Sequence, residues 1–129
     1  MEELVAPNNI VRIYLCGITV YDSSHIGHAR TIILFDVLRR FLISKGYKVT
    51  FIQNFTDVDD KIINRAKKEG ITAQEVAAKY IDSYFNDFDC LNVLRADQYP
   101  HATENIKEMI DLIEGLIKKG HAYISLNGV

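Results

Sequence analysis

The feature that most constrains the fold of this chain is an apolar run followed by a turn of small residues and then a helical pattern. Val11 to Leu15 is short, apolar and rich in β-branched residues apart from Arg12, as expected for a buried strand. After the turn, apolar residues recur at spacings of three and four up to about Lys45, which predicts an amphipathic helix. Residues 48–54 form a second apolar run. This succession predicts a right-handed βαβ unit, and hence an α/β fold with a parallel sheet.

The turn between the first strand and the helix carries a pair of histidines. His25 and His28 stand three residues apart at the expected first turn of the helix, so their side chains share one face. A helix N-terminus offers unpaired N–H groups and positive dipole to a phosphate. Gly27 has no side chain, which lets the flat base or sugar of a nucleotide approach the backbone closely. We therefore expect a nucleotide-phosphate site here, with two surface histidines near a helix cap as the simpler alternative.

Three further helices are predicted downstream. Thr56 or Asp57 is expected to cap the first of them. Thr72 and Glu75 have the spacing of a capping box that opens the second. The third is amphipathic and covers about residues 103–119.

The end of the chain predicts a further strand and a turn. Residues 91–100 are expected to be a connector. Residues 121–129 are expected to form a strand that runs into the hairpin turn Asn127-Gly128, with its return strand beginning at the last residue. A parallel sheet also needs more than two strands with helices on both faces. We therefore expect this chain to be the front part of a larger protein.

Composition restricts the class of protein. The chain has 129 residues, which is the size of one domain, with a formal net charge of −2. Nucleic-acid footprints are usually strongly basic, so this chain is not expected to be the main one. Cys16 and Cys90 lie far apart with no Cys-x-x-Cys pair and no secretory leader, which predicts a reduced, cytoplasmic setting. The longest apolar stretch is too short to span a bilayer, so no membrane association is expected.

Several segments, in register from about residue 11 onwards, resemble one family. They are Cys16-Gly-Ile-Thr-Val-Tyr-Asp22, His25-Ile-Gly-His28 with Ala29-Arg30-Thr31, Asn54-Phe-Thr-Asp-Val-Asp-Asp-Lys-Ile-Ile63, Asp87-Phe-Asp to Arg95-Ala-Asp-Gln-Tyr-Pro100, and Gly120-His-Ala-Tyr123. Together they resemble the N-terminal part of the catalytic domain of the cysteinyl-tRNA synthetases. A His-x-Gly-His motif alone would be weak evidence for this family, since nucleotidyl transferases of similar fold also carry it.

The resemblance implies a class I aminoacyl-tRNA synthetase with a truncated, Rossmann-like parallel sheet. Such an enzyme activates L-cysteine with ATP and Mg²⁺ to cysteinyl-adenylate and transfers it to the 3′ end of tRNA(Cys). Residues 1–121 would be the N-terminal half of the catalytic domain, and residues 122–129 the start of an inserted hairpin region. The family's Lys-Met-Ser-Lys-Ser loop, its remaining zinc ligands and its anticodon-binding region would lie beyond this chain. We therefore expect the chain alone to be inactive.

The resemblance also assigns roles to individual residues. His25, Gly27 and His28 would bind ATP, with the two histidines as the catalytic pair that stabilises charge on phosphoryl oxygens. The cysteine pocket would include Gly17, Thr19 and Thr56. Cys16 would be one ligand of the family's Zn²⁺. A buried structural thiol is the alternative for Cys16, and turn and cap chemistry for the two threonines.

Two other functions are compatible with the same segments. One is the related ligase that joins cysteine to an amino sugar in mycothiol synthesis. The other is a catalytically inactive nucleotide-binding module that retains the fold. Because about half of a parallel sheet would be missing, we also expect exposed strand edges to favour self-association.

Overall fold

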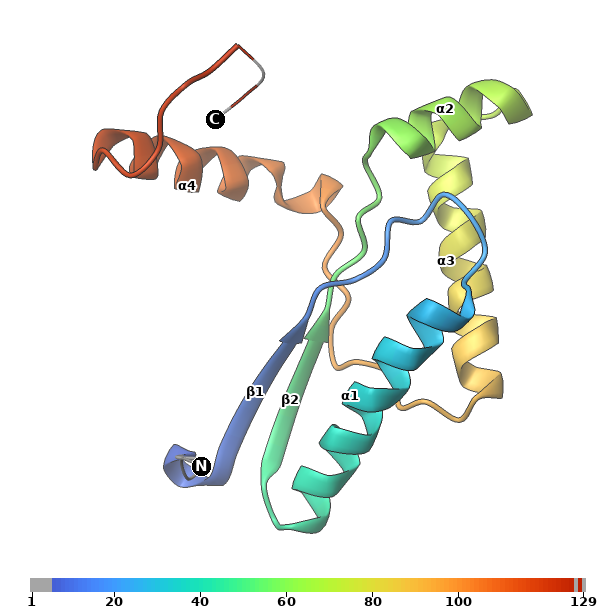
Figure 1. Ribbon diagram of the computed structural model, residues 1–129, viewed down its shortest axis with the longest axis vertical. Helices are drawn as coiled ribbons and strands as arrows, with labels where there is room; N and C mark the ends of the chain where they lie inside the picture. The colour runs from blue at the N-terminus through green and yellow to red at the C-terminus, as the bar shows by residue number, and fades with distance from the viewer. Residues whose placement is uncertain (1–5, 127, 129) are drawn as a thin grey trace.

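The computed structural model describes residues 6–126 and 128. Its elements, in chain order, are the 3₁₀ turn Pro7–Asn9, β1 (Ile10–Leu15), α1 (Ile26–Ser44), β2 (Lys48–Gln53), α2 (Asp60–Glu69), α3 (Ala73–Cys90), the 3₁₀ turn Thr103–Asn105 and α4 (Ile106–Lys118). β1 and β2 pair in parallel, with Leu15 opposite Gln53. α1 forms the crossover between them and lies against one side of the sheet (Figure 1). The predicted βαβ unit and the α/β, Rossmann-like architecture are confirmed.

Both ends of α1 agree with the sequence. His25 is the N-cap residue, so His28 lies in the first turn as predicted. At the other end Gly46 has a φ of +88°, a left-handed conformation that glycine adopts without steric cost. Of the side chains on α1, Ile32, Leu42 and the unexpected Arg39 are buried.

Of the caps predicted for the next two helices, the one at α2 was wrong and the one at α3 is confirmed. α2 is capped by Asp59, whose carboxylate accepts the N–H of Lys61 at 2.8 Å. The prediction of Thr56 or Asp57 as this cap was wrong, because the extended backbone continues to Asp59 before it turns. At α3 the capping box is confirmed, with Thr72 and Glu75 each bonded to the backbone of the other.

The core lies between the sheet, α1 and the pair α2–α3. Figure 1 shows α2 lying across one end of α3, and the two helices pack together. Fully buried side chains come from the loop after β1, from the segment after β2 and from both helices: Val20, Phe55, Ile62 and Val76. The ring of Phe55 also contacts those of Tyr84, Phe85 and Tyr99. The loop after β1 is therefore held in place by the core itself.

The predicted connector is more ordered than a linker. The end of this segment and the residue after it, residues 97–101, run parallel to β2, on the edge of β2 away from β1. The N–H of Asp97 donates to the carbonyl of Phe51 at 2.8 Å, and the N–H of Gln53 donates to the carbonyl of Gln98 at 3.1 Å. This segment adds a third, irregular backbone to the sheet.

The C-terminal part of the chain stands apart from this core. α4 projects to one side, with no buried residue along its length (Figure 1). The prediction of a strand after it was wrong for residues 121–126, which form no strand; instead Ser125 and Gly128 make an isolated antiparallel bridge. Asn127 and Val129, on which the predicted hairpin turn and return strand depend, lie outside the described residues.

No helix in the described part of the chain has the length and hydropathy to cross a bilayer.

Candidate functional site

The loop of residues 16–25, here called the signature loop, leaves the carboxyl end of β1 and is anchored by backbone pairing. Thr19 and Thr56 form a parallel bridge. The N–H of Val20 donates to the carbonyl of Thr56 at 3.3 Å, and the N–H of Thr56 donates to the carbonyl of Ile18 at 3.1 Å. Because Ile18 and Val20 are also buried, alternate residues of the loop point into the core and the others face outward. This alternation keeps Thr19 beside the site.

Gly17 allows the loop to touch the segment after β2. Its N–H donates to the side-chain oxygen of Asn54 at 2.7 Å, and the hydroxyl of Tyr14 donates to the same oxygen at 3.0 Å. A Cβ atom at position 17 would come within 1.4 Å of the backbone carbonyl oxygen of Asn54. No side chain fits there, so glycine is required by the close approach of two backbones.

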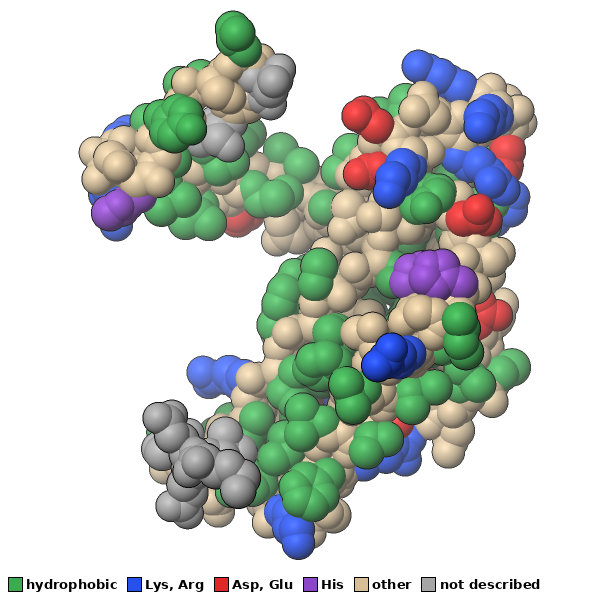
Figure 2. Space-filling model, viewed as in Figure 1, with side chains coloured by type: hydrophobic (Ala, Val, Ile, Leu, Met, Phe, Trp, Pro, Cys, Tyr) green, Lys and Arg blue, Asp and Glu red, His purple; other side chains and the backbone are tan. Residues whose placement is uncertain are grey.

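The two histidines form a reciprocal cap on α1. The Nδ1 atom of His25 accepts the N–H of Gly27 at 3.1 Å, and the Nδ1 atom of His28 accepts the N–H of His25 at 3.4 Å. Their rings stack with centroids 3.7 Å apart and planes 18° from parallel. Figure 2 shows histidine side chains gathered at the surface near the start of α1. The predicted shared face is therefore correct.

This geometry fixes the tautomer that each ring adopts when it is neutral. Since each Nδ1 accepts a backbone hydrogen, the proton of each neutral imidazole is on Nε2. Partial burial, and after it the neighbouring His25 ring, lower the pKa of His28 below the ordinary value of 6.5. At neutral pH His28 therefore presents an uncharged Nε2–H donor, which is suited to an anionic oxygen.

Gly27 has a role that the sequence did not reveal. A Cβ atom at this position would lie 2.9 Å from Cε1 and 3.0 Å from Nδ1 of the His25 ring. The missing side chain thus makes room for the imidazole that caps the helix. The close approach of a nucleotide to the backbone at Gly27 stays a prediction, and it is compatible with this capping role.

Two hollows meet at His28. The first, of about 310 Å³, lies at the carboxyl end of β1 and is lined by Leu15, Cys16, Gly17, Ile18, Thr19, His28, Thr31, Ile32 and Gln53. The second, of about 240 Å³, is lined by Thr19, Tyr21, Asp22, Ser23, His25, His28 and Lys61. Thr19 and His28 line both, so a ligand in one hollow would adjoin a ligand in the other. Thr56 and Gly27 line neither, although each contacts a residue that does.

Lys61 adds positive charge to the second hollow. Its ammonium lies over the ring of Tyr21, 5.3 Å from the centroid, and among the described residues no carboxylate forms an ion pair with it. The hollow therefore combines a lysine with the imidazoles of His25 and His28. That set of donors suits phosphate oxygens.

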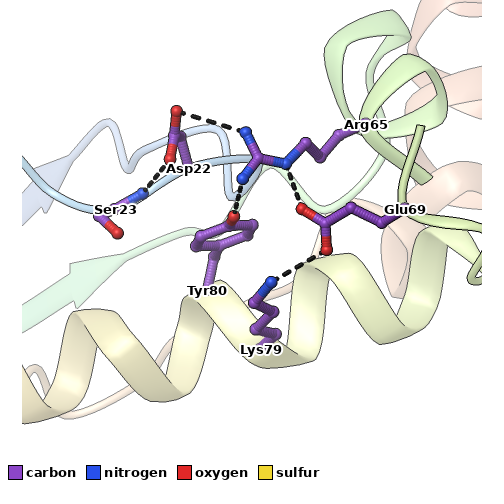
Figure 3. Close-up of polar contacts among 6 residues, drawn as sticks. All are labelled: Asp22, Ser23, Arg65, Glu69, Lys79 and Tyr80. Carbon is purple, nitrogen blue, oxygen red and sulfur yellow. Dashed lines mark hydrogen bonds and ion pairs between the residues drawn. The ribbon is translucent and has the colours of Figure 1, made fainter. Parts of the chain in front are cut away.

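A network of ion pairs ties the far end of the signature loop to α2 and α3 (Figure 3). The guanidinium of Arg65 lies 3.7 Å from the carboxylate of Asp22 and donates to the hydroxyl of Tyr80 at 2.5 Å. Arg65 also pairs with Glu69, which in turn accepts from Lys79 at 2.9 Å. Arg65, on α2, thus joins α3 to Asp22, a residue of the loop that lines the second hollow.

The described residues do not form a complete metal site. Cys16 is exposed and lines the first hollow, so the alternative of a buried structural thiol was wrong. No group of three or more His, Cys, Asp or Glu side chains suited to a metal ion occurs within residues 6–126 and 128. A zinc ion needs three or four protein ligands, and this region supplies one thiol.

Comparisons with known proteins identify relatives. Residues 3–129 match the family described as tRNA synthetases class I (C) catalytic domain. A relative from Maridesulfovibrio salexigens, named cysteine–tRNA ligase, is 56% identical over 128 residues, which are 98% of this chain and 26% of that protein. One of the same name from Nitratidesulfovibrio vulgaris strain DP4 is 60% identical over 118 residues, 92% of this chain and 24% of that protein.

A third relative, from Archaeoglobus fulgidus, carries the same name and is 56% identical over 114 residues, 88% of this chain and 24% of that protein. The chain thus spans about a quarter of the length of the curated relatives it matches. The expected resemblance is confirmed over the whole signature loop and the helices that hold it. The chain belongs to the family of class I (C) tRNA synthetase catalytic domains.

Proposed function

We propose that this chain forms the ATP and cysteine corner of a cysteine–tRNA ligase. The observation that carries the proposal is the pair of adjoining hollows that share Thr19 and His28. A ligase of this class must hold an amino acid and a nucleotide so that the carboxylate meets the α-phosphorus. Two neighbouring hollows, one with a thiol and one with phosphate-type donors, meet that requirement.

In the proposed reaction the carboxylate of L-cysteine attacks the α-phosphorus of ATP, held with Mg²⁺, and pyrophosphate leaves. The Nε2–H groups of His25 and His28 donate to the phosphoryl oxygens, where negative charge grows in the transition state. Lys61, across the same hollow, adds a cation. No covalent or proton-transfer role is needed for the histidines. A hydroxyl at the 3′ end of tRNA(Cys) then attacks the carbonyl carbon of the adenylate, so that the cysteinyl ester forms and AMP leaves.

The first hollow would take the amino acid. Gly17 and Thr19 line it, and Thr56 supports Thr19 through the backbone bridge, so all three belong to the proposed cysteine pocket. Cys16 would be one ligand of a Zn²⁺ ion whose other ligands come from the rest of a longer protein. Because the described residues supply only this donor, we propose no step that depends on the metal.

The other proposals follow from the same family. We place the longer protein in the cytoplasm, where tRNA charging serves protein synthesis, and we expect the chain alone to be inactive. The ligase that joins cysteine to an amino sugar would use similar hollows. The names of the relatives favour the tRNA ligase.

The test is cysteine-dependent exchange of pyrophosphate into ATP by the longer protein that contains this chain. His28→Ala should lower kcat about 10²- to 10³-fold, the usual cost of removing one donor to a developing anion. The matched control is His121→Ala, since His121 is exposed beyond α4 and lines neither hollow. No exchange with cysteine, or equal loss in both variants, would contradict the proposal.

A further inference from the structure

Gln53 is a polar residue in an apolar place. It is the last residue of β2, points to the same side of the sheet as Phe51, and is only 2% exposed. The strand period favours an apolar residue at such a position. Burial of an amide is costly unless each of its groups finds a partner. The hydrogen-bond partners of Gln53 therefore indicate why a polar side chain occupies this position.

One end of the amide is fixed. The hydroxyl of Tyr84 donates to Oε1 of Gln53 at 2.9 Å, and Tyr84 is itself only 2% exposed. Burial raises the pKa of Tyr84, so the phenol keeps the proton that it donates in this hydrogen bond. The backbone N–H of Gln53 is also engaged, by the carbonyl of Gln98 at 3.1 Å. The side-chain oxygen and the backbone N–H of Gln53 are thus both hydrogen-bonded, and these two bonds set the direction of its Nε2 group.

The other end of the amide is unpaired, in a residue that lines the first hollow. Within the described residues Nε2 of Gln53 has no hydrogen-bond partner, and Gln53 lines the 310 Å³ hollow together with Cys16, Thr19 and His28. An oriented, nearly buried donor without a partner requires an acceptor from a ligand or from water. The first hollow is therefore suited to a ligand that brings a hydrogen-bond acceptor to Gln53.

We propose that Nε2–H of Gln53 donates to the carboxylate of the amino acid bound in the first hollow, and that Tyr84 positions it. The inference rests on the proposed function, which puts L-cysteine in that hollow. Among the groups of this amino acid the ammonium only donates, and the carboxylate is the strong acceptor. A hydrogen bond to an ionised group is about twice as strong as a neutral one, so its loss should be visible in binding.

The test uses pyrophosphate exchange by the longer protein with two substitutions. Gln53→Met keeps the length of the side chain but removes the donor, and should raise KM for cysteine roughly 10- to 100-fold, with KM for ATP unchanged. Inhibition by cysteamine, which has the thiol and amine but no carboxylate, should be unaffected. Tyr84→Phe retains the amide but frees it to rotate, and should raise KM for cysteine by a smaller factor.

The matched control is Gln98→Met. Gln98 is exposed on the far edge of β2 and contributes its backbone carbonyl, which the substitution retains. An unchanged KM for cysteine in Gln53→Met, even with a lowered melting temperature, would show a structural role only and overturn the inference. Equal weakening of cysteine and cysteamine would also overturn it, because the carboxylate would not be the acceptor. Failure of the unsubstituted protein to exchange with cysteine would overturn the proposed function itself.

Discussion

The helices α3 and α4 have similar apolar spacing and opposite environments. α3 buries five side chains, namely Val76, Ala77, Tyr80, Tyr84 and Phe88. α4 buries none, and its apolar residues from Ile106 to Leu116 are 37–65% exposed. Figure 2 shows the hydrophobic side chains of α4 open to the surface. Apolar spacing therefore indicates which face of a helix avoids water, but not what covers that face.

The difference extends to the regions around the two helices. The signature loop, α2 and α3 complete one another: Val20, Ile62 and Val76 are fully buried, and Arg65 joins the loop to both helices. Nothing among the described residues closes over α4 in the same way. The site is thus built on the part of the chain that forms its own core. Substitutions in this part should therefore change the stability of the protein much more than substitutions in α4.

The largest contrast is expected between two glycines. Gly17→Ala, in the signature loop, forces a Cβ atom to within 1.4 Å of a backbone oxygen, and should cost about 5 kcal/mol of stability. Gly115→Ala, in α4, meets nothing within 4 Å and should stabilise the helix by roughly 0.5–1 kcal/mol. Denaturant unfolding followed by circular dichroism measures both. A folded Gly17→Ala variant of normal stability would mean that the loop does not pack on Asn54 as described.

Two isoleucines test the same contrast at a smaller scale. Ile62→Ala in α2 removes a side chain that is 0% exposed, and should cost about 2–5 kcal/mol from lost burial and the cavity left behind. Ile110→Ala in α4 removes one that is 50% exposed, and should change the stability by less than about 0.5 kcal/mol. Similar losses in both variants would show that α4 is covered in solution.

Local signals in the sequence were enough for much of the fold. The βαβ unit follows from the change of period between Val11 and Asn54, the capping box from Thr72 and Glu75, and the end of α1 from the apolar spacing that stops near Lys45. Each of these depends on residues close together in the chain. The site loop was predictable for the same reason, because strand, turn and helix start follow one another directly.

Contacts between distant residues were not predictable. The third backbone of the sheet pairs Gln98 with β2 across more than forty residues, with no strand period to mark it. The burial of Arg39 depends on the carbonyl of Arg95, which accepts from its guanidinium at 2.7 Å, and on Asp97. Gln53 gave one signal, a polar residue on the inner face of a strand, but its partner Tyr84 lies on another element.

Self-association of the chain is the next effect in size. The exposed apolar face of α4, and the edge of β1 that pairs with no strand among the described residues, should allow copies of this chain to associate as its concentration rises. Ile110→Lys should weaken this association about tenfold, or ~1.4 kcal/mol. Glu108→Lys, which places the same side chain on a polar position of α4, is the control. Analytical ultracentrifugation measures both, and a chain that stays monomeric at every concentration would contradict the expectation.

The smallest effect concerns the histidine pair. Because partial burial and His25 lower the pKa of His28 below 6.5, the unfolded chain binds a proton there more readily than the folded chain does. The contribution of His28 to stability is therefore intact above pH 6.5 and is lost as the pH falls through the lowered, folded-state pKa. NMR titration of the imidazole resonances measures this midpoint directly, with His28→Gln to assign the signal.

The second histidine gives this measurement its control. His25→Asn removes the neighbouring charge but keeps a side chain able to cap the helix. The midpoint of His28 should then rise only part of the way towards 6.5, because burial is the larger cause of the shift. A full return to 6.5 would mean that the second imidazole alone holds His28 neutral. A midpoint above 6.5 in the unsubstituted chain would contradict the stacked, reciprocally capped geometry, and with it the uncharged Nε2–H donor on which the proposed phosphate contact depends.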